Sequence, residues 1–171
     1  MKRVLSLTLC LLSVLAIGTD ALAAEYGTTQ VFLTALEEEA DMLSDYQYTG
    51  YTYGLDDNGN EHVYLTFEVE GVPEMNVTVL FNETGTVCSM QLFSYIQTNQ
   101  ADRVEVLDIL NGLNNSYRYV RWYIDDYNEV CLQIDPIFRD SADCGSALVE
   151  YLLMMVRVAE AGYPMLEAYA A

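Results

Sequence analysis

The segment between Val87 and Gly145 decides the fold, because it contains a strand, a helix and a hairpin in immediate succession. It reads TVCSMQLFSYI at 86–96, RVEVLDILNGLNNSY at 103–117 and RYVRWYIDDYNEVCLQID at 118–135. The first and third pieces alternate apolar and polar residues, which is typical of strands with one buried face. The second piece repeats its apolar residues at the three- and four-residue spacing of a helix. This segment therefore predicts a strand, a helix and a two-stranded hairpin.

The residues before this segment predict one helix and three further strands of the same sheet. Apolar residues recur at helical spacing over Thr28–Leu43, with a run of acidic residues on the opposite, solvated side. The period then changes to two, which predicts strands at Tyr46–Tyr53, 62–70 and 75–82. The Asn-Gly pair at 58–59 favours a type I′ turn between the first two of these strands.

The residues after the hairpin predict the helix that covers the sheet. This helix is expected to begin between Asp140 and Asp143 and to end near Ala159, because Gly162 and Pro164 are poor helix residues. Together the elements predict an α+β fold in the order α-β-β-β-β-α-β-β-α. We expect an antiparallel sheet with helices packed mainly on one of its faces.

The first 23 residues predict a secretory signal peptide. A short basic start precedes an apolar run at 4–17, and a small-x-small cleavage site follows at 21–23. The apolar run is too short to span a bilayer, and no later run reaches the roughly 20 apolar residues that a spanning helix needs. We therefore expect signal peptide 1–23, a single domain over 24–171, and export to the periplasm or the exterior.

The chain is strongly acidic, with a formal net charge of −19 at pH 7 from 26 Asp and Glu against 7 Lys and Arg. Nucleic acid and anionic membrane surfaces repel a chain of this charge. Neither is therefore expected as a partner.

Two acidic segments and one histidine are the candidates for chemistry. Asp56–Glu61 places oxygens at alternate positions, but its glycine is the fourth residue, whereas an EF-hand calcium loop needs its glycine at the sixth. Asp125 and Asp126 could serve acid–base catalysis, although Asp is also favoured in turns. By alternation, His62 lies on the face opposite Cys88, which argues against a Cys–His nucleophilic pair. We interpret both acidic segments as hairpin turns and expect no catalytic residue, metal or cofactor.

Three cysteines follow the predicted signal peptide, an odd number for an oxidising compartment. Cys88 alternates with apolar core residues, whereas Cys131 falls on the opposite side of the sheet. Cys144 lies where the covering helix begins, which places it on the same side as Cys88. If an intrachain disulfide forms, we expect it to join Cys88 and Cys144. The alternative is that all three thiols stay reduced.

Several aromatic residues fall on the side of the predicted sheet that faces away from the core. By alternation, the aromatic side chains on this side are those of Tyr64, Phe93, Tyr95, Tyr119 and Tyr123. Leu80, Arg121 and Glu68 lie among them. Exposed aromatic clusters commonly mark interaction surfaces. We expect this face to bind a partner or a second copy of the chain; the alternative is that the second helix or a loop covers it.

Two stretches resemble the YbjN family, whose fold resembles that of type III secretion chaperones. They are GTVCSMQLFSYI at 85–96 and LDILNGLNNSYRYVRWYIDDYNEVCLQID at 107–135, in which an Asn-x-x-Asn helix end is followed by a hairpin. The resemblance implies a bacterial regulatory or sensory protein without established catalytic residues. It also implies, for exported relatives, a second cysteine shortly before Cys88, but this chain has Phe81 and Asn82 there.

The sequence thus leads to two functional expectations of different classes. The first is an exported, non-enzymatic binding or regulatory module that engages a protein or peptide partner through the sheet face. The alternative is a secreted hydrolase or cation-dependent enzyme that uses surface carboxylates.

Overall fold

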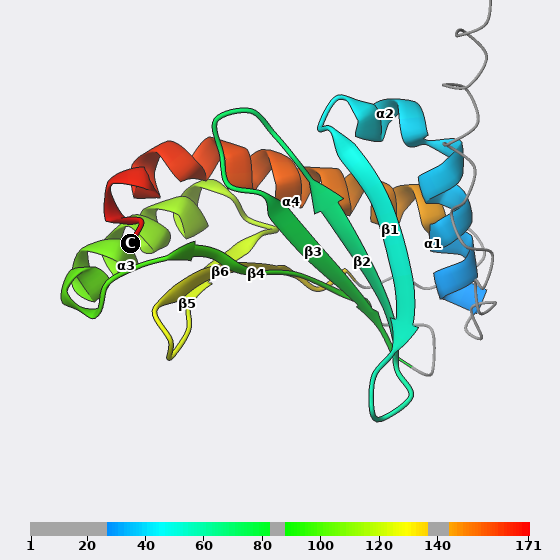
Figure 1. Ribbon diagram of the computed structural model, residues 1–171, viewed down its shortest axis with the longest axis horizontal. Helices are drawn as coiled ribbons and strands as arrows, with labels where there is room; N and C mark the ends of the chain where they lie inside the picture. The colour runs from blue at the N-terminus through cyan, green and yellow to red at the C-terminus, as the bar shows by residue number, and fades with distance from the viewer. Residues whose placement is uncertain (1–26, 83–87, 137–143) are drawn as a thin grey trace, which may run out of the picture.

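A six-stranded antiparallel sheet with the long helix α4 across one face forms the protein (Figure 1). The computed structural model describes residues 27–82, 88–136 and 144–171. The sheet order is β1-β2-β3-β4-β6-β5, and the strands β1 to β6 span Tyr48–Leu55, Glu61–Phe67, Met75–Phe81, Cys88–Gln97, Arg121–Ile124 and Glu129–Ile134. The helices α1 to α4 span Gly27–Glu38, Ala40–Ser44, Arg103–Ser116 and Gly145–Leu166.

The predicted α+β fold is confirmed, and the observed elements agree with the predicted order apart from a division of the first helix. Two expectations lie outside the described residues: the signal peptide over 1–23, and the start of the last helix between Asp140 and Asp143. Within the described ranges, no helix is long and apolar enough to cross a membrane.

The core lies between one face of the sheet and the helices α1 and α4. The sheet contributes alternate residues of its strands, among them Val63, Leu65, Phe67, Met75, Val77, Val79, Phe81, Met90 and Leu92. The α4 helix contributes Leu148, Leu152, Leu153, Met155, Val156 and Ala159. The helices α1 and α4 lie close together at Gly145, where a Cβ atom would lie 2.8 Å from the carbonyl oxygen of Val31. The covering helix therefore packs directly on α1 as well as on the sheet.

The helices differ from the sequence expectations at two points. The first predicted helix is divided at Glu39 into α1 and α2. The α4 helix continues through Gly162 and Pro164 to Leu166, so the prediction that these two residues end it is wrong. Pro164 lies in the last turn, where it removes only one backbone hydrogen bond. Gly162 is required by packing, because a Cβ atom there would lie 2.5 Å from Cζ2 of Trp122.

The β1–β2 hairpin closes with a three-residue loop. The N–H of Asp56 donates to the carbonyl oxygen of Asn60 at 2.9 Å, and the N–H of Gly59 donates to that of Asp56 at 3.0 Å. Within the loop only Gly59 has a positive φ, of 82°. This is a type I turn followed by a left-handed residue, so the expected type I′ turn is wrong.

The β5–β6 hairpin closes in the same way. The N–H of Asp125 donates to the carbonyl oxygen of Glu129 at 3.0 Å, and Asn128 takes the left-handed position with a φ of 64°. In both hairpins Oδ1 of the first Asp accepts two backbone N–H groups at 2.8 Å, from Asn58 and Asn60 and from Tyr127 and Glu129. Both acidic segments are thus hairpin turns in which the Asp side chain fixes the loop.

The α3 helix covers the edge of the sheet at β5. Oδ1 of Asn114 accepts the N–H of Trp122 at 2.8 Å, and Nδ2 of Asn114 donates to the carbonyl oxygen of Trp122 at 2.9 Å. Arg103, at the other end of α3, donates to the carbonyl oxygen of Asp125 at 2.7 Å. The Asn114 side chain therefore makes the hydrogen bonds to Trp122 that a further strand would otherwise make. Asn114 lies inside α3 rather than ending it.

Replacing Asn114 by Ala should destabilise the protein by about 1–3 kcal/mol, because both backbone groups of Trp122 lose their partner. Urea unfolding measures this change. Asn115→Ala is the matched control, since Asn115 is an exposed neighbour in the same helix turn. It should alter stability by no more than about 0.5 kcal/mol. Equal effects of the two substitutions would contradict the role of Asn114.

Candidate binding surface

The outer face is the side of the sheet opposite α1 and α4. Cross-strand pairing aligns its side chains in rows, because residues opposite each other on neighbouring strands lie side by side. The central row consists of Thr52, Tyr64, Thr78, Gln91, Gln133 and Arg121. Neighbouring strands lie about 4.8 Å apart, so this row extends over roughly 24 Å. Hydroxyl, amide and aromatic groups therefore extend across the sheet, with the guanidinium of Arg121 at the β5 edge.

Three of the predicted aromatic residues lie on the outer face, spread over the strands β2, β4 and β5. Tyr64 on β2 and Phe93 on β4 are each 47% exposed. Tyr123 on β5 is half-buried, and the Arg121 guanidinium lies 5.4 Å from the centroid of its ring. Tyr119 lies in the connection from α3 to β5 and is 68% exposed. Of the predicted aromatic residues, Tyr64, Phe93 and Tyr119 are thus accessible.

Tyr95 is buried, and its predicted place on the outer face is wrong. The pairing of β4 with β6 changes register between Leu92 and Ile96, and Ser94 has a φ of 49°. This bulge turns Tyr95 to the core side, where it is 3% exposed. Its hydroxyl donates to the carbonyl oxygen of Ala159 in α4 at 3.1 Å. Burial raises the pKa of Tyr95.

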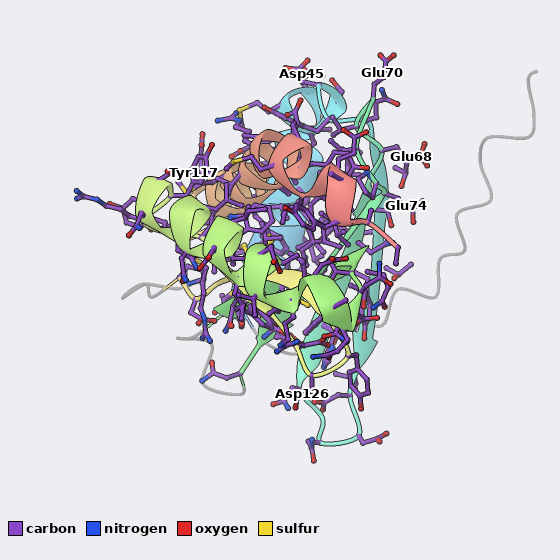
Figure 2. All side chains as sticks on the ribbon, turned by 90° about the vertical axis from the view of Figure 1, so that its left-hand side faces the viewer. Asp45, Glu68, Glu70, Glu74, Tyr117 and Asp126 are labelled. Carbon is purple, nitrogen blue, oxygen red and sulfur yellow. The ribbon has the colours of Figure 1, made fainter. Side chains whose placement is uncertain are left out.

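The strands carry few charges although the chain is strongly acidic. They contain two acidic residues, Glu61 and Glu129, and one basic residue, Arg121. Acidic side chains are instead found at the ends of the strands. Figure 2 shows Glu68 and Glu74 projecting from the sheet on the side away from α4. The outer face thus has a largely neutral centre with carboxylates at its ends.

Glu61 is a buried carboxylate that the sequence analysis missed. It is the first residue of β2, has no exposed surface, and accepts a hydrogen bond from the Tyr53 hydroxyl at 2.7 Å. Glu61 lies on the core face because every second residue of a strand points to the same side, and Val63 and Leu65 point to the core. This two-residue period is the signal in the sequence that could have identified it. Glu61 faces the interior, where it holds β1 to the core rather than contributing to the outer face.

His62 lies on the outer face beside the β1–β2 turn and is half-buried. Its Nδ1 lies 3.2 Å from the Tyr64 hydroxyl, and its Nε2 lies 3.5 Å from Oδ2 of Asp56. Hydrogen bonds from the side chain and backbone of Asn60 hold the pKa of Asp56 well below its usual range. Among the described residues, no group of three His, Cys, Asp or Glu side chains is placed to hold a metal ion.

The three cysteines lie on the predicted sides of the sheet. Cys88 and Cys144 are buried on the core side, and both are thiols in this structure. Burial raises the pKa of Cys88, with a smaller contribution from the nearby Cys144. Cys131 is buried on the outer side opposite Tyr123, and burial also raises its pKa. The Cys88–Cys144 disulfide stays a prediction.

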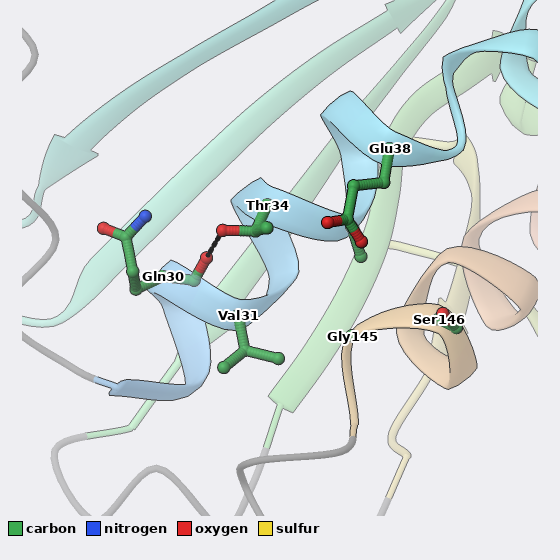
Figure 3. Close-up of a pocket in the computed structure, with 7 residues that line it drawn as sticks. Gln30, Val31, Thr34, Glu38, Gly145 and Ser146 are labelled. Atoms are coloured by element: carbon green, nitrogen blue, oxygen red, sulfur yellow. Dashed lines mark hydrogen bonds between the residues drawn. The ribbon is translucent and has the colours of Figure 1, made fainter.

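A separate pocket of about 380 Å³ lies between α1 and α4 (Figure 3). Its lining residues are Gln30, Val31, Thr34, Ala35, Glu38, Gly145 and Ser146. The Thr34 hydroxyl donates to the carbonyl oxygen of Gln30 at 3.0 Å, so its proton is used within α1. The pocket lies on the helix side and shares no residue with the outer face.

The thiols of Cys88 and Cys131 should react slowly with iodoacetamide at pH 7.5 in the folded protein. Burial and a raised pKa both reduce the reactive thiolate, so we expect rates at least about tenfold below those in urea. Any intrachain disulfide should join Cys88 to Cys144, because Cys131 points to the other side. Peptide mapping after alkylation measures how far each thiol has reacted, and mapping without reduction identifies any disulfide. A Cys131 disulfide with either cysteine would contradict the assignment of faces.

The outer face, with its exposed aromatic side chains, is therefore the candidate functional surface. No family model, no curated protein and no solved structure matches the chain. The resemblance to the YbjN family accordingly stays a prediction, carried by the stretches at 85–96 and 107–135.

Proposed function

We propose that the protein is an exported, non-enzymatic binding or regulatory module that holds a protein or peptide partner on its outer face. The observation that carries this proposal is the exposure of Tyr64 and Phe93 on the sheet side away from α4 (Figure 1). Large apolar groups exposed on an otherwise polar surface favour association, because binding removes them from water. Aromatic side chains are also enriched at the centres of protein interfaces.

Two of the carboxylates that the sequence offered for enzymatic chemistry have structural roles, which supports a binding module over an enzyme. Asp56 and Asp125 each accept two backbone N–H groups in their hairpin turns. These hydrogen bonds fix each side chain against its loop, and those from Asn60 lower the pKa of Asp56. A general acid or base must instead exchange protons with a substrate within hydrogen-bonding distance.

The substitutions Phe93→Ser and Tyr64→Ser should abolish capture of a partner from native extract while leaving the fold intact, since both side chains are already half exposed. Affinity capture with the full chain, followed by quantitative mass spectrometry, measures the loss. Tyr127→Ser is the control, because Tyr127 is 78% exposed but lies in the β5–β6 turn. Tyr95→Ser would not test the face, because Tyr95 belongs to the core.

The same protein should show no turnover on a panel of hydrolase substrates. Reproducible turnover that is lost when one surface carboxylate is replaced would contradict the proposal and favour the enzymatic alternative. Capture that survives the double substitution Tyr64→Ser/Phe93→Ser would contradict the assignment of binding to the outer face.

A further inference from the structure

Three carboxylates at the ends of the outer face are held in place by side chains of that face. Nδ2 of Asn76 donates to Oε1 of Glu74 at 2.8 Å. The Ser94 hydroxyl donates to Oε2 of Glu129 at 2.5 Å. We call Glu74, Glu129 and Asp135 the carboxylate rim.

Asp135 is the most firmly held member of the carboxylate rim. Its Oδ1 accepts the Ser89 hydroxyl at 2.7 Å, and both of its oxygens accept Nε2 of Gln133, at 3.0 and 2.9 Å. Exposed carboxylates ordinarily lose side-chain entropy when they form an ion pair, and this loss cancels much of the gain. Because the rim carboxylates are already oriented, an approaching cation meets them with less of that cost.

The rim has the dimensions of a protein-binding surface rather than of a small-ligand site. Glu129 and Asp135 lie at opposite ends of β6, about 20 Å apart at roughly 3.3 Å per residue. Phe93 and Tyr123 lie between these ends on the neighbouring strands β4 and β5. An aromatic centre bordered by charges is the arrangement of a protein interface with an apolar core and a polar rim.

We propose that the partner of the outer face presents an apolar or aromatic centre flanked by Lys or Arg side chains that pair with Glu74, Glu129 and Asp135. This inference rests on the proposed function and adds the chemistry of the partner. The central row of the face carries no carboxylate, so the apolar centre of a partner can approach it without burying an unpaired acid. The positive groups of the partner then meet the negative rim, which favours association electrostatically.

A second copy of the chain does not fit this surface. Two apposed outer faces would bring two carboxylate rims together, and each chain carries a net charge of −19. Arg121 is the only Lys or Arg in the six strands, and its guanidinium already lies over the ring of Tyr123. Like charges placed opposite each other suppress association. The full chain should therefore remain monomeric in sedimentation experiments at about 100 µM.

A phage-displayed library of random 16-residue peptides, selected against the full chain, tests the proposal. We expect the enriched peptides to contain aromatic or leucine residues flanked by Lys or Arg. The most enriched peptide, made synthetically, should bind about tenfold more weakly to the triple variant Glu74→Gln/Glu129→Gln/Asp135→Asn, because three exposed ion pairs are lost. Its affinity should also fall severalfold between 50 and 500 mM NaCl, mainly through slower association.

The matched control is the triple variant Glu105→Gln/Glu150→Gln/Glu160→Gln, which removes the same charge from α3 and α4. It should change the affinity by less than about twofold, because those exposed carboxylates lie on the helices. Each neutral Gln or Asn side chain of the rim variant keeps an amide oxygen. This oxygen can still accept hydrogen bonds from the side chains of Asn76, Ser94, Ser89 and Gln133. Both variants should therefore fold as the wild type does.

The outcomes separate this proposal from the proposed function. Peptides that lose binding with Phe93→Ser but lack Lys and Arg, or that bind the rim variant normally, overturn the cationic partner and leave the outer face as the binding surface. Peptides whose binding is unchanged by Phe93→Ser overturn both. Dimerisation that Phe93→Ser abolishes would show that the face accepts a second copy and would overturn the proposal.

Discussion

Trp122 in β5 contacts both α3 and α4. The packing of this edge of the sheet against the two helices depends on the contacts around Trp122. Its backbone is held by the side-chain amide of Asn114 in α3, and its ring lies where any side chain at Gly162 of α4 would collide. The ring of Tyr95, turned inward by the bulge in β4, has its centroid 6.3 Å from that of Trp122. The four-residue strand β5 is thereby fixed against three other elements.

Most of the large apolar side chains of the sheet point to the helix side. The outer face therefore carries smaller polar groups and a few exposed aromatic rings. The acidic residues follow the same division. They occupy helices, turns and strand ends, and Glu129 is the one carboxylate that the described strands place on the outer face. An acidic protein that keeps the centre of one broad surface nearly neutral can bind an apolar partner there and still reject anionic ones.

Local patterns predicted the fold class, the strands and the positions of Tyr64 and Phe93, because alternation reports directly which side of a regular strand is buried. The predictions were wrong where contacts between elements far apart in the sequence determine the local structure. The inward turn of Tyr95 follows from a bulge against β6, and Gly162 is set by the space beside Trp122 rather than by helix propensity. The turn after β1 was misassigned because an Asn-Gly pair suits two turn types, and the Asp56 carboxylate selects between them.

The central claim is that Phe93 lies on an open face while Tyr95, two residues later, lies in the core. Hydroxyl-radical footprinting of the folded protein, read by mass spectrometry, tests this directly because the rate of side-chain oxidation follows solvent exposure. The structure predicts rapid oxidation of Tyr64 and Phe93 and protection of Tyr95 until the protein is unfolded in urea. Protection of Phe93, or oxidation of Tyr95 as fast as that of Phe93 in the folded state, would contradict this account.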